Sequence, residues 1–306
     1  MRTSGYVVAL GGFALLMAGG LGLGLWLNAG VARMEPGALE LDVGPELTAV
    51  IVGNSGDDTP DARQVREAAA AYCAEAGCDL VVLLGDTVLP AGPDAPDDPR
   101  LDARIGAWAA IAPTVVVPGD RDVGPIGDGR GFGRLVSWAR DNPDVLAPSA
   151  TFDADAGPAL LIGLDSNELL GGGAGADAQR AWLDQVLAAN ARPWPVALVH
   201  DVDAAEVAAV CGRARVALHA GPGRSWVERC GTTFVASGTG GETPSGEPAP
   251  QGSLHHTPAA GFVVMVAQPD RLEFRFIGAD RRETFRAVKV ASGAVELVDG
   301  TVLRQP

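Results

Sequence analysis

Four short apolar segments, each ending in a cluster of polar side chains, constrain the fold of this chain more than any other feature of its sequence. They are too short to form core helices and are rich in valine and leucine, which is typical of buried strands. Their bounds are Leu47–Val52, Leu80–Leu84, Thr114–Val117 and Val196–His200. The carboxyl ends of neighbouring parallel strands meet at one edge of a sheet, where α/β proteins bind ligands. We therefore expect an α/β domain with a site at that edge.

Helix signals lie between these segments. Thr59 followed by Pro60 is a favourable N-cap and first-turn pair, and Gly77 is a suitable stop. Further helices are expected near residues 102–111 and 179–187. This alternation of strand and helix predicts βαβ units and a parallel arrangement of the strands.

After about residue 232 the pattern changes to strands with little helix between them. Expected strands lie at 234–236, 262–266 and 272–277, and the last alternates apolar and polar residues as a half-exposed antiparallel strand does. This end of the chain is either a separate domain or a second sheet of the same domain. The short connections favour the second sheet.

The N-terminal region contains 22 consecutive residues without a charge, from 6 to 27. A helix of that length spans the hydrocarbon core of a membrane, which is about 30 Å thick. Arg2 and Arg33 flank it, so an anchor would leave residues 1–5 in the cytoplasm. The alternative is a cleaved signal peptide with its small-residue cleavage site at 30–32. Both readings export the rest of the chain, which is then periplasmic, extracellular or, after cleavage, secreted.

The remaining chain is expected to hold one folded domain. Residues 28–46 are interpreted as a linker, 47–290 as the domain and 291–306 as a C-terminal tail.

The net charge of −15 excludes nucleic acid as a natural partner and disfavours an anionic lipid surface.

Four cysteines occur in the exported part of the chain. An even number in an oxidising compartment predicts two disulfides, most simply Cys73–Cys78 and Cys211–Cys230. The alternative is buried free thiols. The spacing of the first pair is too wide for a usual zinc knuckle.

Five polar clusters follow the predicted strands in a fixed order. They are Gly53-Asn54-Ser55-Gly56, Gly85-Asp86-Thr87-Val88-Leu89, Gly119-Asp120-Arg121-Asp122, His200-Asp201-Val202 and Gly221-Pro222-Gly223-Arg224. In this order they resemble the motifs of the calcineurin-like metallophosphoesterases, particularly the purple-acid-phosphatase-like branch. The resemblance extends over roughly residues 47 to 290. It implies a four-layer α/β/β/α sandwich of two mixed sheets, here preceded by one transmembrane or signal helix.

The resemblance also implies a site where two divalent cations clamp a phosphate. Two dications about 3.5 Å apart repel by roughly 19 kcal/mol at an effective dielectric constant of about 20, so anionic ligands must offset a large energy. Three implied ligands remain: the bridging carboxylate Asp86, Asp120 and His200. They are enough for one weakly held divalent metal (Mn, Fe, Zn or Mg), or for none.

The other implied positions are degenerate. Asn54 stands for the first metal-binding aspartate, and Leu89 for the tyrosine of the purple enzymes. Pro222 and Arg224 replace two histidines. Arg121 occupies the position of the proton-donating histidine, and a guanidinium group cannot release its proton at neutral pH. No residue is therefore assigned a catalytic role.

Two of these replacements introduce fixed positive charges. We hypothesise that Arg121 and Arg224 neutralise Asp86 and Asp120 in place of a metal and could hold a phosphate bidentately. The alternative is a drifted site held by ordinary ion pairs without a ligand. The adjacent pair His255 and His256 is interpreted as solvated surface in a loop.

The expected function is that of an exported or membrane-tethered pseudophosphatase with a binding or assembly role. Its partners would be the membrane, through the N-terminal helix, an envelope protein, and a phosphate or phosphoester. One alternative is an active phosphoric-ester hydrolase that uses a single divalent metal. Another is a plain ligand-binding α/β domain.

Overall fold

The computed structural model of the chain describes residues 35–124, 129–202, 204–241, 248–297 and 302–303. The chain divides into residues 1–34 and a compact unit from residue 35 onward. The predicted transmembrane or signal helix lies outside the described residues. In the part that the structure describes, no helix has both the length and the apolar character needed to cross a membrane.

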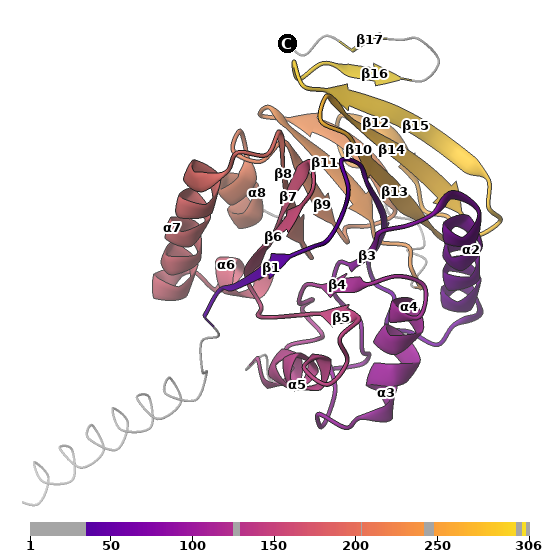
Figure 1. Cartoon of the computed structure of the whole chain (residues 1–306), viewed down its shortest axis with the longest axis vertical. Helices are drawn as coiled ribbons and strands as arrows, with labels where there is room; N and C mark the ends of the chain where they lie inside the picture. Colours follow the sequence, from indigo (N-terminus) through magenta and orange to yellow (C-terminus); the bar gives the residue numbers. More distant parts are fainter. Residues whose placement is uncertain (1–34, 125–128, 203, 242–247, 298–301, 304–306) are drawn as a thin grey trace, which may run out of the picture. The chain divides into compact units, whose positions relative to one another are not determined.

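Two mixed sheets form the centre of the unit (Figure 1). The eight-stranded sheet contains, in spatial order, β1 (Gly37–Glu40), β6 (Phe152–Ala156), β7 (Ala159–Gly163), β8 (Trp194–Val199), β9 (Val216–His219), β11 (Thr232–Ser237), β10 (Arg224–Arg229) and β12 (Ser253–Thr257). The nine-stranded sheet contains β17 (Val302–Leu303), β16 (Val295–Leu297), β15 (Glu283–Val290), β14 (Arg271–Gly278), β13 (Gly261–Ala267), β2 (Leu47–Val52), β3 (Leu80–Leu83), β4 (Thr114–Val116) and β5 (Val145–Leu146).

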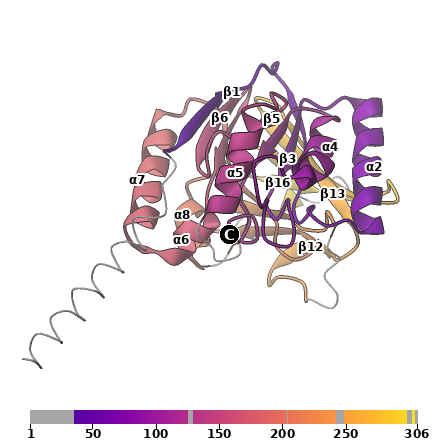
Figure 2. The same ribbon diagram turned by 90° about the horizontal axis from the view of Figure 1, so that it is seen from below.

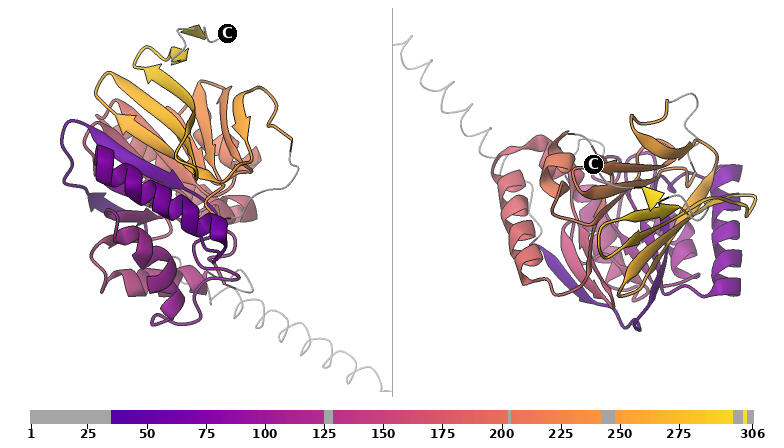
Figure 3. Two further views of the ribbon diagram at one scale, coloured as in Figure 1. Left: turned by 90° about the vertical axis from the view of Figure 1, so that its right-hand side faces the viewer. Right: turned by 90° about the horizontal axis from the view of Figure 1, so that it is seen from above.

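Helices cover the outer faces of both sheets. They are α2 (Pro60–Ala76), α3 (Pro99–Leu101), the π-helical turn η1 (Asp102–Gly106), α4 (Ala107–Ala109), α5 (Arg130–Ala139), α6 (Ser166–Gly171), α7 (Gly173–Ala189) and α8 (Ala204–Val210). Figures 2 and 3 show α7 and α2 on opposite flanks with the two sheets between them. The prediction of two mixed sheets with helices is therefore confirmed.

The main core lies between the two sheets. Ile51 and Phe274 of one sheet pack there with Leu198 and Trp226 of the other, and all four are fully or almost fully buried. A second core lies between the eight-stranded sheet and the α6–α8 side, and includes Leu183 of α7. Because β2, β3 and β8 are covered on both faces, they consist of continuous apolar residues, which made them visible in the sequence.

Local signals place α2 as expected. The Oγ1 atom of Thr59 accepts a hydrogen bond from the amide of Ala62 at 3.1 Å, and Pro60 is the first helical residue. The same hydroxyl donates to the carbonyl oxygen of Gly241 at 3.0 Å, which ties the start of the helix to a loop distant in sequence. The disulfide Cys73–Cys78 follows at the end of α2.

The folded unit extends past the expected bounds at both ends. Within the expected linker, β1 pairs with β6 in parallel, and after residue 290 the strand β16 pairs with β15. Short strands at the edges of sheets bury little apolar surface and therefore leave a weak sequence pattern. The β-rich end is no separate domain, because β13 pairs with β2 in one sheet.

The second predicted disulfide is also present. Cys211, which follows α8, is joined to Cys230 in the turn between β10 and β11, with the two Cα atoms 5.5 Å apart. The described residues contain no free cysteine.

Candidate metal-binding site

The site begins with two side chains in left-handed backbone conformations. Asn54, which follows β2, has φ 55°, and Asp86, which follows β3, has φ 53°. Residues other than glycine rarely adopt this region, and it persists where the surrounding structure enforces it. Because such strain is concentrated at functional sites, this edge of the sheets is a candidate functional site.

Two glycines allow the loops of this edge to meet. A Cβ atom on Gly85 would lie 2.6 Å from the Cα atom of Gly119 and 2.6 Å from Nδ1 of His200. A Cβ atom on Gly119 would overlap the backbone nitrogen and the carboxylate of Asp86. The glycines of the second and third motifs therefore bring Asp86 against the neighbouring loop and against the end of β8.

Asp86, Asp120 and His200 come together at this point. The Nε2 atom of His200 lies 3.2 Å from Oδ1 of Asp120 and 3.6 Å from Oδ1 of Asp86. Each residue offers one atom, and these three atoms lie within 4.8 Å of one another. Within the described ranges, this is the one group of three histidine, cysteine or acidic side chains placed to hold a metal ion.

The orientation of His200 fits metal binding. Its Nδ1 atom donates to the carbonyl oxygen of Leu84 at 2.7 Å, which leaves Nε2 facing the two carboxylates. Metal-binding histidines characteristically donate their other ring nitrogen to a carbonyl or carboxylate group in this way. Asp86 and His200 are buried while Asp120 is exposed, so a ligand would reach the site from the side of Asp120.

Asp86, Asp120 and His200 lie close enough that the charge of each one shifts the pKa of the others. Burial raises the pKa of Asp86 to about 7, although His200 opposes this effect. Burial lowers the pKa of His200, but the hydrogen bond to Asp120 and the charge of Asp86 outweigh burial and raise that pKa to about 9. The hydrogen bond from His200 in turn lowers the pKa of Asp120. Without a metal, an imidazolium group thus supplies the positive charge that the carboxylates require.

Comparisons with known proteins agree on the fold. The sequence matches no protein-family model and no curated protein. The structure is similar to GAP50, the anchor in the inner membrane complex of Plasmodium, with a TM-score of 0.66, 12% identity and coverage of 79% of this chain and 87% of that one. It is similar to the purple acid phosphatase PPD1 from yellow lupin seeds, with a TM-score of 0.62, 14% identity and coverage of 83% of this chain and 55% of that one. It is also similar to PhoD, with a TM-score of 0.56, 13% identity and coverage of 89% and 74%.

This chain has the metallophosphoesterase fold. The fold predicted from the order of the five polar clusters is thereby confirmed.

Asn54 has a structural contact at the first metal position expected from the metallophosphoesterase motifs. Its amide nitrogen donates to the carbonyl oxygens of Ala220 and Gly238, both at 3.1 Å. These carbonyls follow β9 and β11 of the eight-stranded sheet, whereas Asn54 follows β2 of the nine-stranded sheet. The amide group therefore joins the ends of the two sheets, and its nitrogen, which acts only as a hydrogen-bond donor, does not bind a metal.

Arg121 lies beside Asp86, as hypothesised. Its backbone amide donates to Oδ1 of Asp86 at 3.0 Å, and its Nε atom lies 3.6 Å from Oδ2 of the same carboxylate. The side chain is about half exposed, at 47%. Arg121 is thus close enough to share the charge of Asp86 and open enough to meet a ligand.

Arg224 does not reach the site, and this part of the hypothesis is wrong. Its guanidinium group donates to the carbonyl oxygens of Ile277, of Phe262 at 3.4 Å and of Ala259 at 3.4 Å. The side chain is completely buried, and it fits because Gly261 has no Cβ atom. Arg224 begins β10 and shares the inner face of that strand with Trp226, so strand alternation directs it between the sheets. Burial lowers the pKa of Arg224 to about 10, which leaves it charged at neutral pH.

The remaining replaced positions contribute no polar side chain. Pro222 is exposed in the loop before β10, and the carbonyl oxygen of Leu89 accepts a hydrogen bond from Arg100 at 3.0 Å.

The interpretation of His255 and His256 as solvated loop residues is wrong, because both belong to β12 and their rings carry buried nitrogens.

Asp122, the last residue of the third polar cluster, is a supporting residue to which no role was assigned from the sequence. Its Oδ1 atom accepts from the amide and hydroxyl of Thr87, at 2.9 and 3.1 Å, and from the amide of Val88 at 3.2 Å. Its Oδ2 atom accepts from the amide of Gly119 at 3.0 Å, and the residue is fully buried. Asp122 therefore fastens the loop of Asp120 to the loop of Asp86. The one indication of this role in the sequence was its position two residues after Asp120, within the same polar cluster.

Proposed function

We propose that this protein is an exported or membrane-tethered pseudophosphatase, which binds a phosphate group or a protein partner and has lost efficient hydrolysis. The observation that carries the proposal is the asymmetry of the site. One cation position keeps Asp86, Asp120 and His200, whereas at the other the amide nitrogen of Asn54 points at two carbonyl oxygens and Arg224 lies elsewhere.

Such a site lacks the parts needed for two-metal hydrolysis. A pair of cations stabilises both the attacking and the leaving oxygen, and a single cation supplies less of this stabilisation. Arg121 cannot act as the acid for the leaving group, because its guanidinium stays protonated. It can still donate hydrogen bonds to a phosphate oxygen while Asp86, Asp120 and His200 hold a divalent cation. That cation would supply electrostatic attraction for the phosphate.

Export and tethering are supported by two independent features. The uncharged stretch from 6 to 27 has the length of an anchor or a long signal peptide. The two disulfides are typical of proteins outside the reducing cytoplasm. An assembly role is supported by the similarity in fold to GAP50, which is described as an anchor in a membrane complex.

A single-metal hydrolase is the second candidate, and the orientation of His200 favours it. A ring held by Leu84 with Nε2 directed at two carboxylates is ready to bind a metal. Three protein ligands plus water is a workable catalytic arrangement.

Hydrolysis of p-nitrophenyl phosphate separates the two candidates. Purified protein is assayed with Mn, Fe, Zn and Mg in turn, beside the Asp86→Ala variant and the surface control Asp144→Asn. We expect the same background rate from all three proteins. Turnover that the control keeps and Asp86→Ala loses would establish the hydrolase and exclude the pseudophosphatase.

A further inference from the structure

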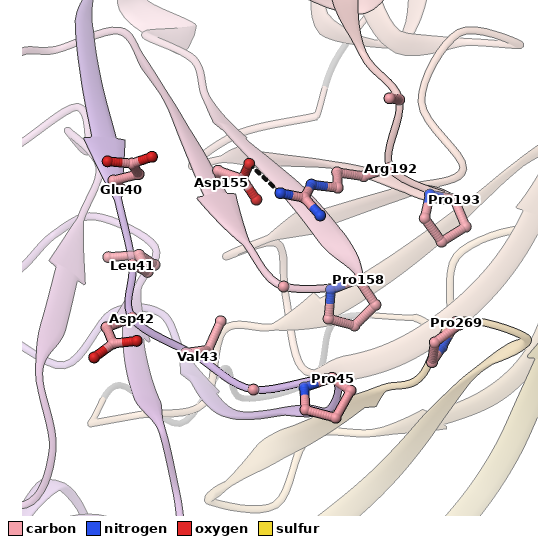
Figure 4. A pocket seen from close by; sticks show the side chains of 13 residues that line it. Glu40, Leu41, Asp42, Val43, Pro45, Asp155, Pro158, Arg192, Pro193 and Pro269 are labelled. Atoms are coloured by element: carbon pink, nitrogen blue, oxygen red, sulfur yellow. Dashed lines mark hydrogen bonds and ion pairs between the residues drawn. The ribbon is translucent and has the colours of Figure 1, made fainter.

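A cavity of about 700 Å³, whose lining residues are drawn in Figure 4, opens at the edge of the sheets opposite to Asp86. It is formed by the connection from β1 to β2, the turn between β6 and β7, the segment before β8 and the turn between β13 and β14. Strand β8 begins at this cavity and ends at His200, so its length separates the two sites by roughly 20 Å. The volume lies within the usual range of ligand sites.

Proline rings make part of the cavity wall apolar and rigid. Four loops each contribute one proline ring: Pro45, Pro158, Pro193 and Pro269. The indole nitrogen of Trp194 donates to the carbonyl oxygen of Gln268 at 2.6 Å, which fixes the turn of Pro269 to the start of β8. Because proline has a fixed φ, these walls need little ordering when a ligand binds.

The charge of the cavity is unbalanced. Glu40 pairs in register with Asp155 on the neighbouring strand, which places two carboxylates side by side, and Asp42 follows. Arg192 forms an ion pair with Asp155. Glu40 and Asp42 form no ion pair with any residue in the described ranges. Like charges at paired positions destabilise a sheet, and a cation placed between them relieves this repulsion.

The cavity adjoins an open strand edge. β1 is an edge strand, and the amides of Gly37 and Leu41 donate toward β6, to Thr151 at 2.9 Å and to Asp155 at 3.0 Å. The intervening Ala38 and Glu40 therefore turn their backbone groups away from β6. Nothing in the described part of the chain pairs with this outer edge. Such an edge is a template for an added strand.

We infer that an extended segment of a partner protein pairs with the outer edge of β1 and inserts an arginine or lysine side chain into this cavity. The charged end of that side chain would meet Glu40 and Asp42, which both line the cavity. The net charge of −15 favours the approach of a basic segment. This contact would be the surface through which the proposed assembly role operates, and it does not depend on metal or phosphate binding at Asp86.

Titration of a peptide into the full chain in detergent tests whether a basic extended segment binds at β1 and the cavity. The probe is a capped eight-residue peptide of alternating serine and valine with one central arginine, and its control replaces arginine by the neutral isostere citrulline. We expect at least tenfold tighter binding of the arginine peptide. The E40Q/D42N double variant should lose at least tenfold in affinity, and Ala191→Trp, which fills the cavity from an exposed position, should abolish binding. The matched control E67Q/D144N, which removes two exposed charges elsewhere, should bind as the parent does.

Three results would overturn the inference. They are equal binding of the citrulline peptide, unchanged binding by a folded E40Q/D42N protein, and binding of acetyl-arginine amide as tight as that of the peptide. The last result would assign the cavity to a free small cation and remove the strand-pairing partner. The Asp86→Ala variant keeps the cavity, so loss of metal or phosphate binding in that variant leaves this test intact.

Discussion

The Nδ1 atom of His200 donates a hydrogen bond to the carbonyl oxygen of Leu84 at 2.7 Å, and this contact fixes the direction of the ring. Leu84 comes at the end of the β3 segment and His200 directly follows β8, so the bond crosses from the nine-stranded to the eight-stranded sheet. It leaves Nε2 facing Asp86 and Asp120. The same bond therefore joins the two sheets at the site edge and orients one candidate metal ligand.

Replacement of Arg121 by alanine should weaken phosphate binding with little loss of stability. The side chain is about half exposed beside Asp86, and a charge-assisted hydrogen bond to phosphate contributes about 1.5–3 kcal/mol. We expect the dissociation constant of inorganic phosphate, measured by calorimetry in the presence of manganese, to rise by at least roughly tenfold. The exposed Arg229→Ala serves as the control. Equal affinity of Arg121→Ala and the parent would remove Arg121 from the site.

Replacement of Arg224 by alanine should have the opposite pattern. The guanidinium group fills space between the sheets and pairs three backbone carbonyls, so its loss leaves a cavity and unpaired acceptors. We expect the free energy of unfolding to fall by about 3 kcal/mol. Urea denaturation measures this loss. Phosphate affinity of the folded variant should equal that of the parent, and a selective loss of affinity would return Arg224 to the site.

Asp122 should be among the most sensitive positions of the domain. Its carboxylate accepts four hydrogen bonds in a fully buried setting. Removal of the carboxylate leaves three amides and a hydroxyl without partners, so Asp122→Ala should destabilise the chain by about 3–5 kcal/mol. Thermal unfolding compared with the exposed Asp144→Ala provides the measurement. A change as small as that of the control would show that the two loops are held by other contacts.

Acid should destabilise the chain partly through His255. Its ring stacks on Phe285 with centroids 4.5 Å apart, and its Nε2 atom is buried without a hydrogen bond. Burial, helped by the charges of Arg224 and His256, lowers the pKa of His255 from 6.5 to about 4. Between these two pH values the unfolded chain binds more protons than the folded one, so stability falls as the pH drops from about 6.5 to 4.

A His255→Phe variant should lose that part of the acid sensitivity. We expect its melting temperature to decline less than that of the parent between pH 6.5 and pH 4, and the two slopes to agree above pH 7. Parallel curves over the whole range would show that His255 does not contribute.

The sequence predicted the part of the fold whose strands are buried on both faces. β2, β3 and β8 and the residues that follow them were recognisable because apolar runs end in polar clusters there. β1, at the edge of its sheet, carries no such pattern and lies within the segment whose sequence predicts a linker. The pairing of β13 with β2 depends on contacts more than 200 residues apart in the chain, which no local pattern encodes.

The sequence indicated where the three candidate metal ligands lie, but it did not indicate the contacts of the residues at the replaced positions. Asp86, Asp120 and His200 meet because each follows a strand that ends at the same edge. The direction of Arg224 depended on which face of β10 it occupies, and the motif alone did not reveal that face. The contacts of Asn54 were also hidden, since its two acceptors lie 166 and 184 residues away.

The content of bound metal tests the central claim most directly. Purified protein is brought to equilibrium by dialysis against manganese, and the metal content inside the bag in excess of the dialysate is measured by plasma mass spectrometry, beside Asp86→Ala and the control Asp144→Asn. The account predicts one manganese ion per chain in the parent and the control, and none in Asp86→Ala. Two ions per chain in the parent would contradict it, because the second position would then be intact despite Asn54.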